Sequence, residues 1–376
     1  MQTGGLQLRL PHGPTIHLGS QDTLQAQVVL NNWQVFGASL RSGDIGFAQS
    51  FIAHDWDTPD LTTLLRVLLR NRAALDDMVF GHWWGRLAYQ IRHAWRRNTR
   101  RQSRDNIHAH YDLGNDFYRL WLDPSMTYSS AWFDGNTAQD LQTAQWAKVR
   151  RALRMAGVQA GDRVLEIGCG WGGLAEAGAR EFGAQMTGIT LSPSQLQFAQ
   201  ARLQALSLHA DLRLQDYRDT QDGPYDAICS IEMIEAVGRD YWPAYFQAIA
   251  RLLKPGGRAC IQSIVIDDAL FDRYAQSTDF IQQYIFPGGF LPSRATFVAQ
   301  AQAAGLQGMD TLAFGQDYAE TLQRWRKAFV PQRERLSALG FDRRFERTWL
   351  FYLAYCEAAF AEHNTDVVQF TLRKPA

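Results

Sequence analysis

The residues with the clearest chemical pattern are the glycines in the sequence Val-Leu-Glu-Ile-Gly-Cys-Gly-Trp-Gly-Gly at positions 164–173. Residues 164–167 are apolar enough for a buried strand, and the glycines predict a sharp turn into a helix. Glycines at such a turn let a ligand lie directly against the backbone, as in nucleotide-binding βα units. Gly168, Gly170 and Gly173 also fit the dinucleotide pattern G-x-G-x-x-G, which alone is weak evidence. The loop therefore predicts a cofactor that contains a nucleoside, without saying which one.

The strand expected at 185–190 argues against a dinucleotide. A nicotinamide fold places an Asp or Glu there, about 20 residues after the glycine loop, for the ribose hydroxyls. Here the strand ends in Thr190, followed by a polar helix start that contains Ser192 and Pro193. The closely spaced glycines resemble instead the first motif of S-adenosylmethionine methyltransferases, which admits the amino-acid end and ribose of that cofactor. A nicotinamide-dependent dehydrogenase is the distant alternative.

Acidic residues follow two further strands that the sequence predicts, at 211–214 and 225–231. Ligands bind at the carboxyl ends of strands in open α/β sheets, so these acids are expected near the cofactor. Asp216 could accept the adenine amine and Tyr217 could cover the ring, although a plain surface turn is the alternative. Glu235 has apolar neighbours and is the candidate for a buried acid, because carboxylates in apolar surroundings are usually functional or paired. Glu232 also fits a solvated loop residue.

The pattern of strands and helices from residue 163 onward predicts the fold class. Alternation of the two implies an α/β fold with a mostly parallel, Rossmann-like class I methyltransferase sheet and helices on both faces. A last strand, expected to be antiparallel, could complete the sheet. The expected strands are 163–167, 185–190, 211–214, 225–231, 258–264 and 367–372, and the expected helices are 172–181, 194–206, 241–252, 294–304, 318–329 and 341–362.

Three regions are expected along the chain. Residues 1–90 read as a small α+β domain, with strands expected at 24–30 and 35–40 and a helix at 61–75. A basic, aromatic linker follows at 91–115, and the methyltransferase domain is expected at 116–376. Its aromatic-rich insertion at about 267–293 either lines an apolar substrate tunnel or packs onto the sheet.

Residues 80–110 combine Trp and Tyr with seven Arg, and no acidic residue lies between Asp77 and Asp105. Such a cationic, aromatic helix suits an anionic lipid surface, where each Arg adds about 1 kcal/mol. A linker helix with solvated Arg side chains is the alternative. RNA binding is a third interpretation, without a recognisable RNA module.

Composition narrows the class of protein. A formal net charge of zero gives no general case for nucleic acid as a partner. The four Cys lack metal-ligand spacing and suit a reducing compartment, so no metal site is expected. No apolar run reaches 18 residues, and the start lacks the charged and apolar regions of a secretory signal. We expect a cytoplasmic protein, peripheral at the inner face of the membrane; a homodimer is an open expectation.

Seven stretches, in order between residues 105 and 370, resemble the cyclopropane-fatty-acyl-phospholipid synthase family of S-adenosylmethionine-dependent lipid C-methyltransferases. Residues 1–90 resemble that family's smaller domain more loosely. The stretches are 110–118, 126–129, 164–173, 215–219, 235–238, 284–293 and 317–318.

The resemblance implies a membrane phospholipid substrate and a set of cofactor-binding residues. These residues are Tyr128, Ser129, Gly168, Cys169, Gly170, Gly172, Thr190, Gln195, Asp216 and Tyr217.

The resemblance also implies a bicarbonate ion, which the family holds near the reacting carbons with a Glu, a His, a Tyr and backbone groups. Glu235 and Tyr318 match the Glu and the Tyr, and Ser130 and Ile264 occupy the backbone positions. Gln262 stands where the family has His. Glutamine can hydrogen-bond an anion but cannot carry a proton, so the bicarbonate mechanism stays open.

The chemistry implied is transfer of a sulfonium methyl group to an alkene. Transfer leaves a carbocation, which aromatic faces can stabilise; Tyr284, Phe286 and Tyr318 are candidates. A base must then remove one proton. Loss from the new methyl closes a cyclopropane ring, which is the product we expect from the acyl chains of phospholipids. Loss from the neighbouring carbon gives a methyl-branched alkene, as in routes to branched or furan fatty acids, and this product is the alternative. A lipid-binding module with an inactive site is a further alternative.

Overall fold

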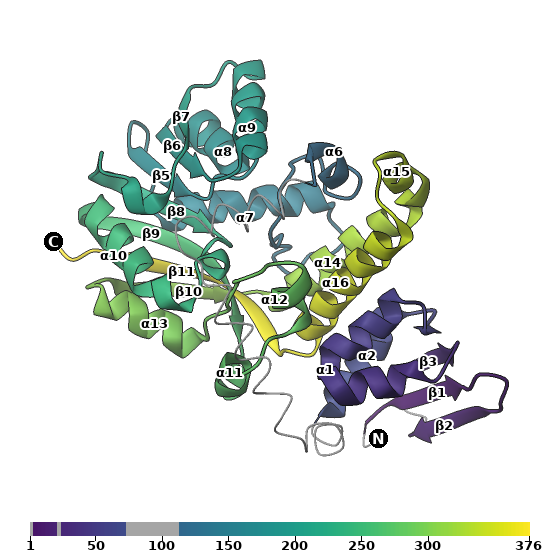
Figure 1. Cartoon of the computed structure of the whole chain (residues 1–376). Coiled ribbons are helices and arrows are strands. Elements are labelled where there is room, and N and C mark those ends of the chain that lie inside the picture. Colours follow the sequence, from purple (N-terminus) through teal and green to yellow (C-terminus); the bar gives the residue numbers. More distant parts are fainter. Residues whose placement is uncertain (1–2, 21–23, 73–112) are drawn as a thin grey trace. The chain divides into compact units, whose positions relative to one another are not determined.

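The computed structural model describes residues 3–20, 24–72 and 113–376, whose contacts divide into two compact units (Figure 1). Of the described residues, the smaller unit combines 3–20, 24–72, 272–287 and 322–364, and the larger unit combines 113–271, 288–321 and 365–376. Because both units use non-consecutive segments, the expected domain boundaries at 90 and 115 stay a prediction. The basic segment at 80–110 lies outside the described residues.

The larger unit is built on a seven-stranded sheet with the order β10-β11-β9-β8-β5-β6-β7. Only β11 runs antiparallel to its neighbours in this sheet. The predicted fold class, with an antiparallel last strand, is therefore confirmed. The strands are β5 (Arg163–Ile167), β6 (Gln185–Thr190), β7 (Ala210–Leu214), β8 (Tyr225–Ile231), β9 (Leu253–Ile266), β10 (Gln307–Ala313) and β11 (Thr365–Arg373).

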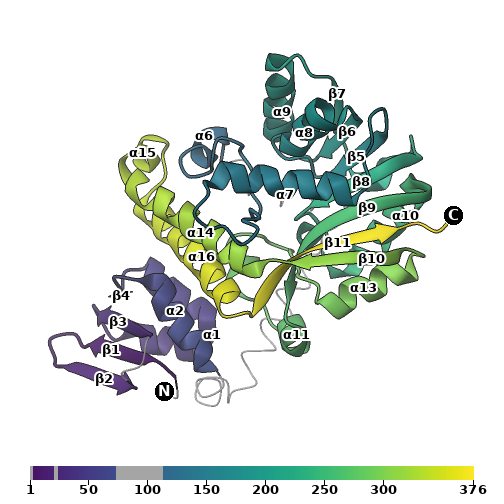
Figure 2. The same cartoon turned by 180° about the vertical axis from the view of Figure 1, so that it is seen from behind.

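Helices cover both faces of this sheet (Figures 1 and 2). On one face, α7, α8 and α9 bury a continuous apolar cluster that includes Leu153, Val164 and Ala175. On the other face, Phe246 of α10 packs against Phe297 of α13 with ring centroids 5.0 Å apart. The helices are α7 (Leu141–Met155), α8 (Gly173–Phe182), α9 (Pro193–Ala205), α10 (Trp242–Leu252) and α13 (Arg294–Ala303).

Two features of this sheet differ from the expectation. β10 was not predicted, because its residues are mostly exposed and carry no buried apolar pattern. β9 begins at Leu253 rather than at residue 258, since Leu253 already pairs with Tyr225 of β8 across a register shift. The Pro and Gly residues at 255–257 therefore lie inside the strand instead of preceding it.

The smaller unit contains a four-stranded sheet with the order β2-β1-β3-β4. The elements that residues 3–72 contribute to it are β1 (Gly5–Arg9), β2 (Thr15–Gly19), β3 (Gln25–Leu30), α1 (Gln34–Ile52), β4 (Trp56–Asp57) and α2 (Leu61–Arg70). The expected strand at 35–40 is wrong, because these residues begin α1. Asn32 Oδ1 accepts a hydrogen bond from Gln34 N at 2.8 Å and so supports a helix start. α1 bends at Ser42 and Gly43, where Gly43 adopts a φ of 56°.

The C-terminal helix α16 (Arg343–Ala361) belongs to the smaller unit because buried polar groups tie it to the N-terminal helices. Arg347 donates to Phe51 O at 2.7 Å and to Trp56 O at 3.1 Å. Glu357 accepts from Thr62 Oγ1 and from Arg326 Nε. These pairs lie up to 296 residues apart in the sequence.

The insertion forms two short helices, α11 (Asp268–Ala275) and α12 (Phe280–Tyr284). Phe280 is fully buried and packs edge-on against Phe351 of α16 at 4.8 Å. This part of the insertion therefore packs within the smaller unit. In the described part of the chain, no helix combines the length and apolar character needed to cross a membrane.

Candidate active site

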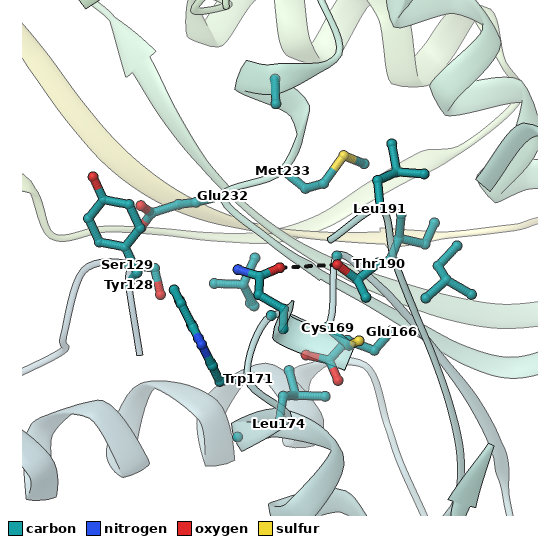
Figure 3. Close-up of a pocket in the computed structure, with 18 of the residues that line it drawn as sticks. Tyr128, Ser129, Glu166, Cys169, Trp171, Leu174, Thr190, Leu191, Glu232 and Met233 are labelled. Atoms are coloured by element: carbon teal, nitrogen blue, oxygen red, sulfur yellow. Dashed lines mark hydrogen bonds between the residues drawn. The ribbon is translucent and has the colours of Figure 1, made fainter. Parts of the chain in front are cut away.

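A pocket opens at the carboxyl ends of β5, β6 and β8 in the larger unit (Figure 3). Nine of the ten residues predicted to bind the cofactor line it, and Gly172 does not. The nine are Tyr128, Ser129, Gly168, Cys169, Gly170, Thr190, Gln195, Asp216 and Tyr217. The sequence missed other lining residues, including Lys148, Glu166, Trp171 and Met233.

Two glycines of the loop act in different ways. Gly170 has a φ of 49°, and a Cβ there would meet no atom within 4 Å, so its bare backbone borders the open pocket. At Gly172, with a φ of 82°, a Cβ would lie 2.9 Å from Ala199 Cβ. Gly172 therefore allows α8 to approach α9, which is packing rather than contact with a ligand.

Polar groups end the strands around the pocket. Thr190 Oγ1 donates to Gln195 Oε1 at 3.0 Å, and this bond joins the end of β6 to the first turn of α9 (Figure 3). Asp216 is buried and paired with Arg218, whose Nε lies 2.9 Å from Asp216 Oδ1. Its carboxylate is therefore already partly neutralised.

Aromatic side chains form another wall of the pocket. The ring of Tyr128 lies 5.5 Å from those of both Tyr118 and Trp121. Trp171, from the glycine loop, packs on Tyr118 at 5.0 Å and donates from Nε1 to Asn115 Oδ1. These contacts hold Tyr128 and Trp171 at the pocket (Figure 3).

A buried lysine lies beneath this wall. Lys148 of α7 is fully buried, and its Nζ lies 2.5 Å from Ser129 Oγ. Burial lowers the pKa of Lys148 to about 8, while the charges of Glu232, Asp123 and Glu166 oppose that shift. Burial raises the pKa of Glu166 to about 8, and Glu166 Oε2 accepts no hydrogen bond within the described residues. In the sequence, Lys148 stands among the apolar residues of α7, and this position could have predicted a buried charge at the site.

Glu232 is the centre of a second polar cluster at the pocket. Its Oε1 accepts from Ser130 N at 2.9 Å and from Gln262 Nε2 at 2.7 Å. Its Oε2 accepts from Tyr318 Oη at 2.7 Å. The interpretation of Glu232 as a solvated loop residue is therefore wrong. Ser130, Gln262 and Tyr318 were predicted to hold an anion, and in the structure they donate hydrogen bonds to the carboxylate of Glu232.

Glu235 lies one turn further on, in the short helix η2 (Ile234–Ala236). Its Oε1 accepts from Ile264 N at 2.5 Å, and its Oε2 is buried without a well-formed hydrogen bond in the described part of the chain. Burial, and then the charge of Glu232, raises the pKa of Glu235 to about 8. The two carboxyl groups therefore differ, because donors hold both oxygens of Glu232, whereas Glu235 Oε2 has no well-formed hydrogen bond from the described residues.

Tyr284, the remaining predicted catalytic residue, belongs to the smaller unit. Its hydroxyl accepts a hydrogen bond from Gln49 Nε2 of α1 at 2.5 Å. It does not line the pocket described above, and its catalytic role stays a prediction.

Comparison with known proteins identifies the family. The model of the mycolic acid cyclopropane synthetase family matches residues 98–370. The chain belongs to this family. The tuberculostearic acid methyltransferase UfaA1 of Mycobacterium tuberculosis is 40% identical over 98% of this chain and 88% of its own length. The cyclopropane-fatty-acyl-phospholipid synthase of Escherichia coli K12 is 32% identical over 92% of this chain and 87% of its own length.

A solved structure supports the same conclusion. The mycolic acid cyclopropane synthase CmaA1, complexed with SAH and CTAB, is 32% identical with a TM-score of 0.68 and covers 72% of this chain and 98% of that chain. The resemblance found in the sequence is confirmed. This protein is an S-adenosylmethionine-dependent fatty acid methyltransferase.

Proposed function

We propose that this enzyme transfers the methyl group of S-adenosylmethionine to the double bond of unsaturated acyl chains in membrane phospholipids, and releases a methyl-branched alkene without ring closure. The choice of a methyl-branched alkene over a cyclopropane ring rests on the residues at the site of proton removal. The amide of Gln262, rather than an imidazole, lies between Gln369 and Glu232. The 40% identity to a tuberculostearic acid methyltransferase over 98% of the chain supports the same product class.

The pocket fits S-adenosylmethionine. The bare backbone at Gly170 leaves room for a ligand, and the Thr190 and Gln195 side chains offer hydrogen-bond partners for ribose hydroxyls. Glu166 lines this pocket, and its buried Oε2 accepts no hydrogen bond from the residues that the structure describes, so it can accept one from the cofactor. When bound, the cofactor supplies an electrophilic methyl group on a sulfonium.

The residues of the chain then have three tasks. They exclude water from the carbocation that methyl transfer leaves on the acyl chain, since water would trap it as an alcohol. Aromatic faces such as Tyr128 stabilise positive charge near the sulfonium. A carboxylate must accept one proton, and the carbon that loses this proton decides between a ring and an alkene.

Cyclopropanation is the second candidate function. It is favoured by the family to which the chain belongs and by the 32% identity to the Escherichia coli synthase. Placement of the enzyme at the cytoplasmic face of a membrane, through residues 80–110, and assembly as a homodimer stay proposals.

An incubation with trideuteromethyl S-adenosylmethionine and vesicles of an unsaturated phosphatidylglycerol tests the product. We expect a labelled acyl chain that retains all three deuterons, with vinylic proton resonances. Ring closure removes one deuteron and gives upfield cyclopropane protons. Upfield ring signals as the main product would overturn the proposal in favour of cyclopropanation.

Cofactor binding is expected to depend on Gln195. Gln195→Ala removes the acceptor of Thr190 Oγ1 and one polar group of the pocket, so S-adenosylmethionine should bind about 10-fold more weakly, or about 1.4 kcal/mol. Isothermal titration calorimetry measures this change. Gln200→Ala, at an exposed position of the same helix, is the matched control and should bind normally. Equal affinities for the two variants would remove Gln195 from the cofactor site.

A further inference from the structure

Glu232 takes the hydrogen-bond donors that the resemblance assigns to a bicarbonate ion. Ser130 N, Gln262 Nε2 and Tyr318 Oη all point at its two carboxylate oxygens, at 2.7–2.9 Å. The fourth expected group, Ile264 N, donates to Glu235 instead. Bicarbonate therefore does not fit this site, since its donors already hold a carboxylate. On the basis of the function proposed above, we propose that the Glu232 carboxylate replaces the exchangeable anion and is the base of the reaction.

A chain of hydrogen bonds fixes the direction in which the Gln262 amide points. Arg151 Nη1 donates to Gln369 Oε1 at 2.6 Å, and a guanidinium can only donate. Gln369 must therefore present its NH₂ group, which donates to Gln262 Oε1 at 3.0 Å. The Gln262 NH₂ group is left to face Glu232. An arginine at one end thus orients an amide so that its NH₂ group donates to the Glu232 carboxyl group at the other end.

The backbone of Glu232 gives independent support. Glu232 has a φ of 49°, in the left-handed region that favours glycine, and this costs on the order of 1 kcal/mol for another residue. Its N–H donates to Gln262 O at 2.8 Å, which holds it in this conformation. Such strain persists where the surrounding structure fixes it and is typical of functional sites.

Charge also favours a built-in carboxylate over an added anion. Lys148 is a buried cation whose charge acts on Glu232, and Glu235 lies close enough for the charge of Glu232 to raise its pKa. Bicarbonate would add another negative charge beside these carboxyl groups. With three donors and a cation, Glu232 is the group best able to stay ionised while Glu235 stays protonated.

The proposed step balances. A carbon–carbon bond forms between the donated methyl and one alkene carbon as the carbon–sulfur bond breaks, leaving a neutral thioether and a carbocation. The C–H electron pair next to the cation then forms the new double bond, and the proton passes to the Glu232 carboxylate. Glu232 and Tyr128 both line the pocket (Figure 3). The proton on Glu232 must leave to solvent before the next turnover.

The test compares wild type, Glu232→Gln and Glu232→Gly in carbon-dioxide-free buffer, with and without added bicarbonate or formate. The readouts are methyl transfer to unsaturated phospholipid vesicles and binding of bicarbonate by calorimetry. Wild type should turn over equally with and without bicarbonate and should not bind it. Glu232→Gln fills the same space without a base, so turnover should fall about 1,000-fold in either buffer. Glu232→Gly vacates the site and should regain at least about 10-fold in rate when an anion is added.

Two controls separate the loss of a base from misfolding of the variants. Glycine suits the positive φ of residue 232, so Glu232→Gly is expected to fold, and thermal unfolding and S-adenosylmethionine binding verify this for both variants. The proposal is overturned if wild type binds or requires bicarbonate, if Glu232→Gln keeps its turnover, or if Glu232→Gly stays inactive with the anion bound. Absence of any lipid methylation by wild type would refute the proposed function instead, while the bicarbonate-binding comparison still decides whether Glu232 occupies the anion site.

Discussion

Replacing Lys148 with Met should lower kcat/KM at neutral pH by about 100-fold and move the acid limb of the pH profile to higher pH. Lys148 is fully buried, and its charge acts on Glu232, Glu166 and Asp123. Burial already raises the pKa of Glu232, and Lys148 is the first of the groups that oppose this rise. Without the cation, the pKa of Glu232 rises further, and less of the base is ionised. A fall of about 100-fold in the ionised fraction corresponds to about 2.7 kcal/mol.

The measurement is kcat/KM for methyl transfer between about pH 6 and pH 9. Activity of the variant should recover toward the wild-type value as the pH rises, since a carboxyl group with a raised pKa loses its proton only at higher pH. Arg154→Met is the matched control, because Arg154 is a cation at an exposed position of the same helix. An equal loss at every pH would show that Lys148 supports only the structure of the pocket, and would refute an electrostatic role.

The sequence could place most of the expected cofactor-binding residues at one pocket because the relevant features are local. Gly168 and Gly170 adopt positive φ angles that few other residues tolerate, so their type directly reports the backbone. Thr190 ends β6, and Asp216 follows the last residue of β7 by two positions. The carboxyl ends of parallel strands meet at one edge of a sheet, which brings these residues to one pocket without any knowledge of packing.

The proton-accepting side could not be predicted in the same way because it depends on contacts between distant segments. Glu232 and Glu235 are three residues apart, and apolar neighbours favoured Glu235. The hydrogen bonds that hold Glu232 come from Ser130, Gln262 and Tyr318, which lie between 30 and 102 positions away. Matching Gln262 and Tyr318 to a family pattern named the right partners, but assigned them to an external anion.

The same limit applies to the smaller unit. The residues of α1 have apolar side chains near its start that also fit a strand, and no local signal connects them to α16. The decisive groups are single buried residues such as Arg347 and Glu357, whose partners lie nearly 300 residues away. Composition and periodicity describe a segment, whereas these contacts decide which segments form a unit.

Arg347→Leu should therefore destabilise the smaller unit by about 3–5 kcal/mol. The Arg347 guanidinium is buried, donates to Phe51 O, Trp56 O and Asp57 Oδ1, and stacks over the Phe51 ring at 3.9 Å. Leucine fills most of the volume but leaves two carbonyl groups without a donor, and an unsatisfied buried acceptor costs about 1–3 kcal/mol.

Urea unfolding followed by tryptophan fluorescence measures this loss, because Trp56 is fully buried beside Phe51. Arg343→Leu is the control, since Arg343 pairs with Glu346 at the exposed start of the same helix and should change stability by less than about 1 kcal/mol.

The loss of stability in Arg347→Leu should also affect the active site. α14 (Gly315–Phe329) carries Tyr318 in its first turn, and its residues from Leu322 onward belong to the smaller unit. Unfolding of the smaller unit should fray α14 and release the Tyr318 hydroxyl from Glu232. Methyl transfer by Arg347→Leu should then fall at the urea concentration of the first unfolding transition, whereas activity that outlasts this transition would show that the larger unit positions Tyr318 by itself.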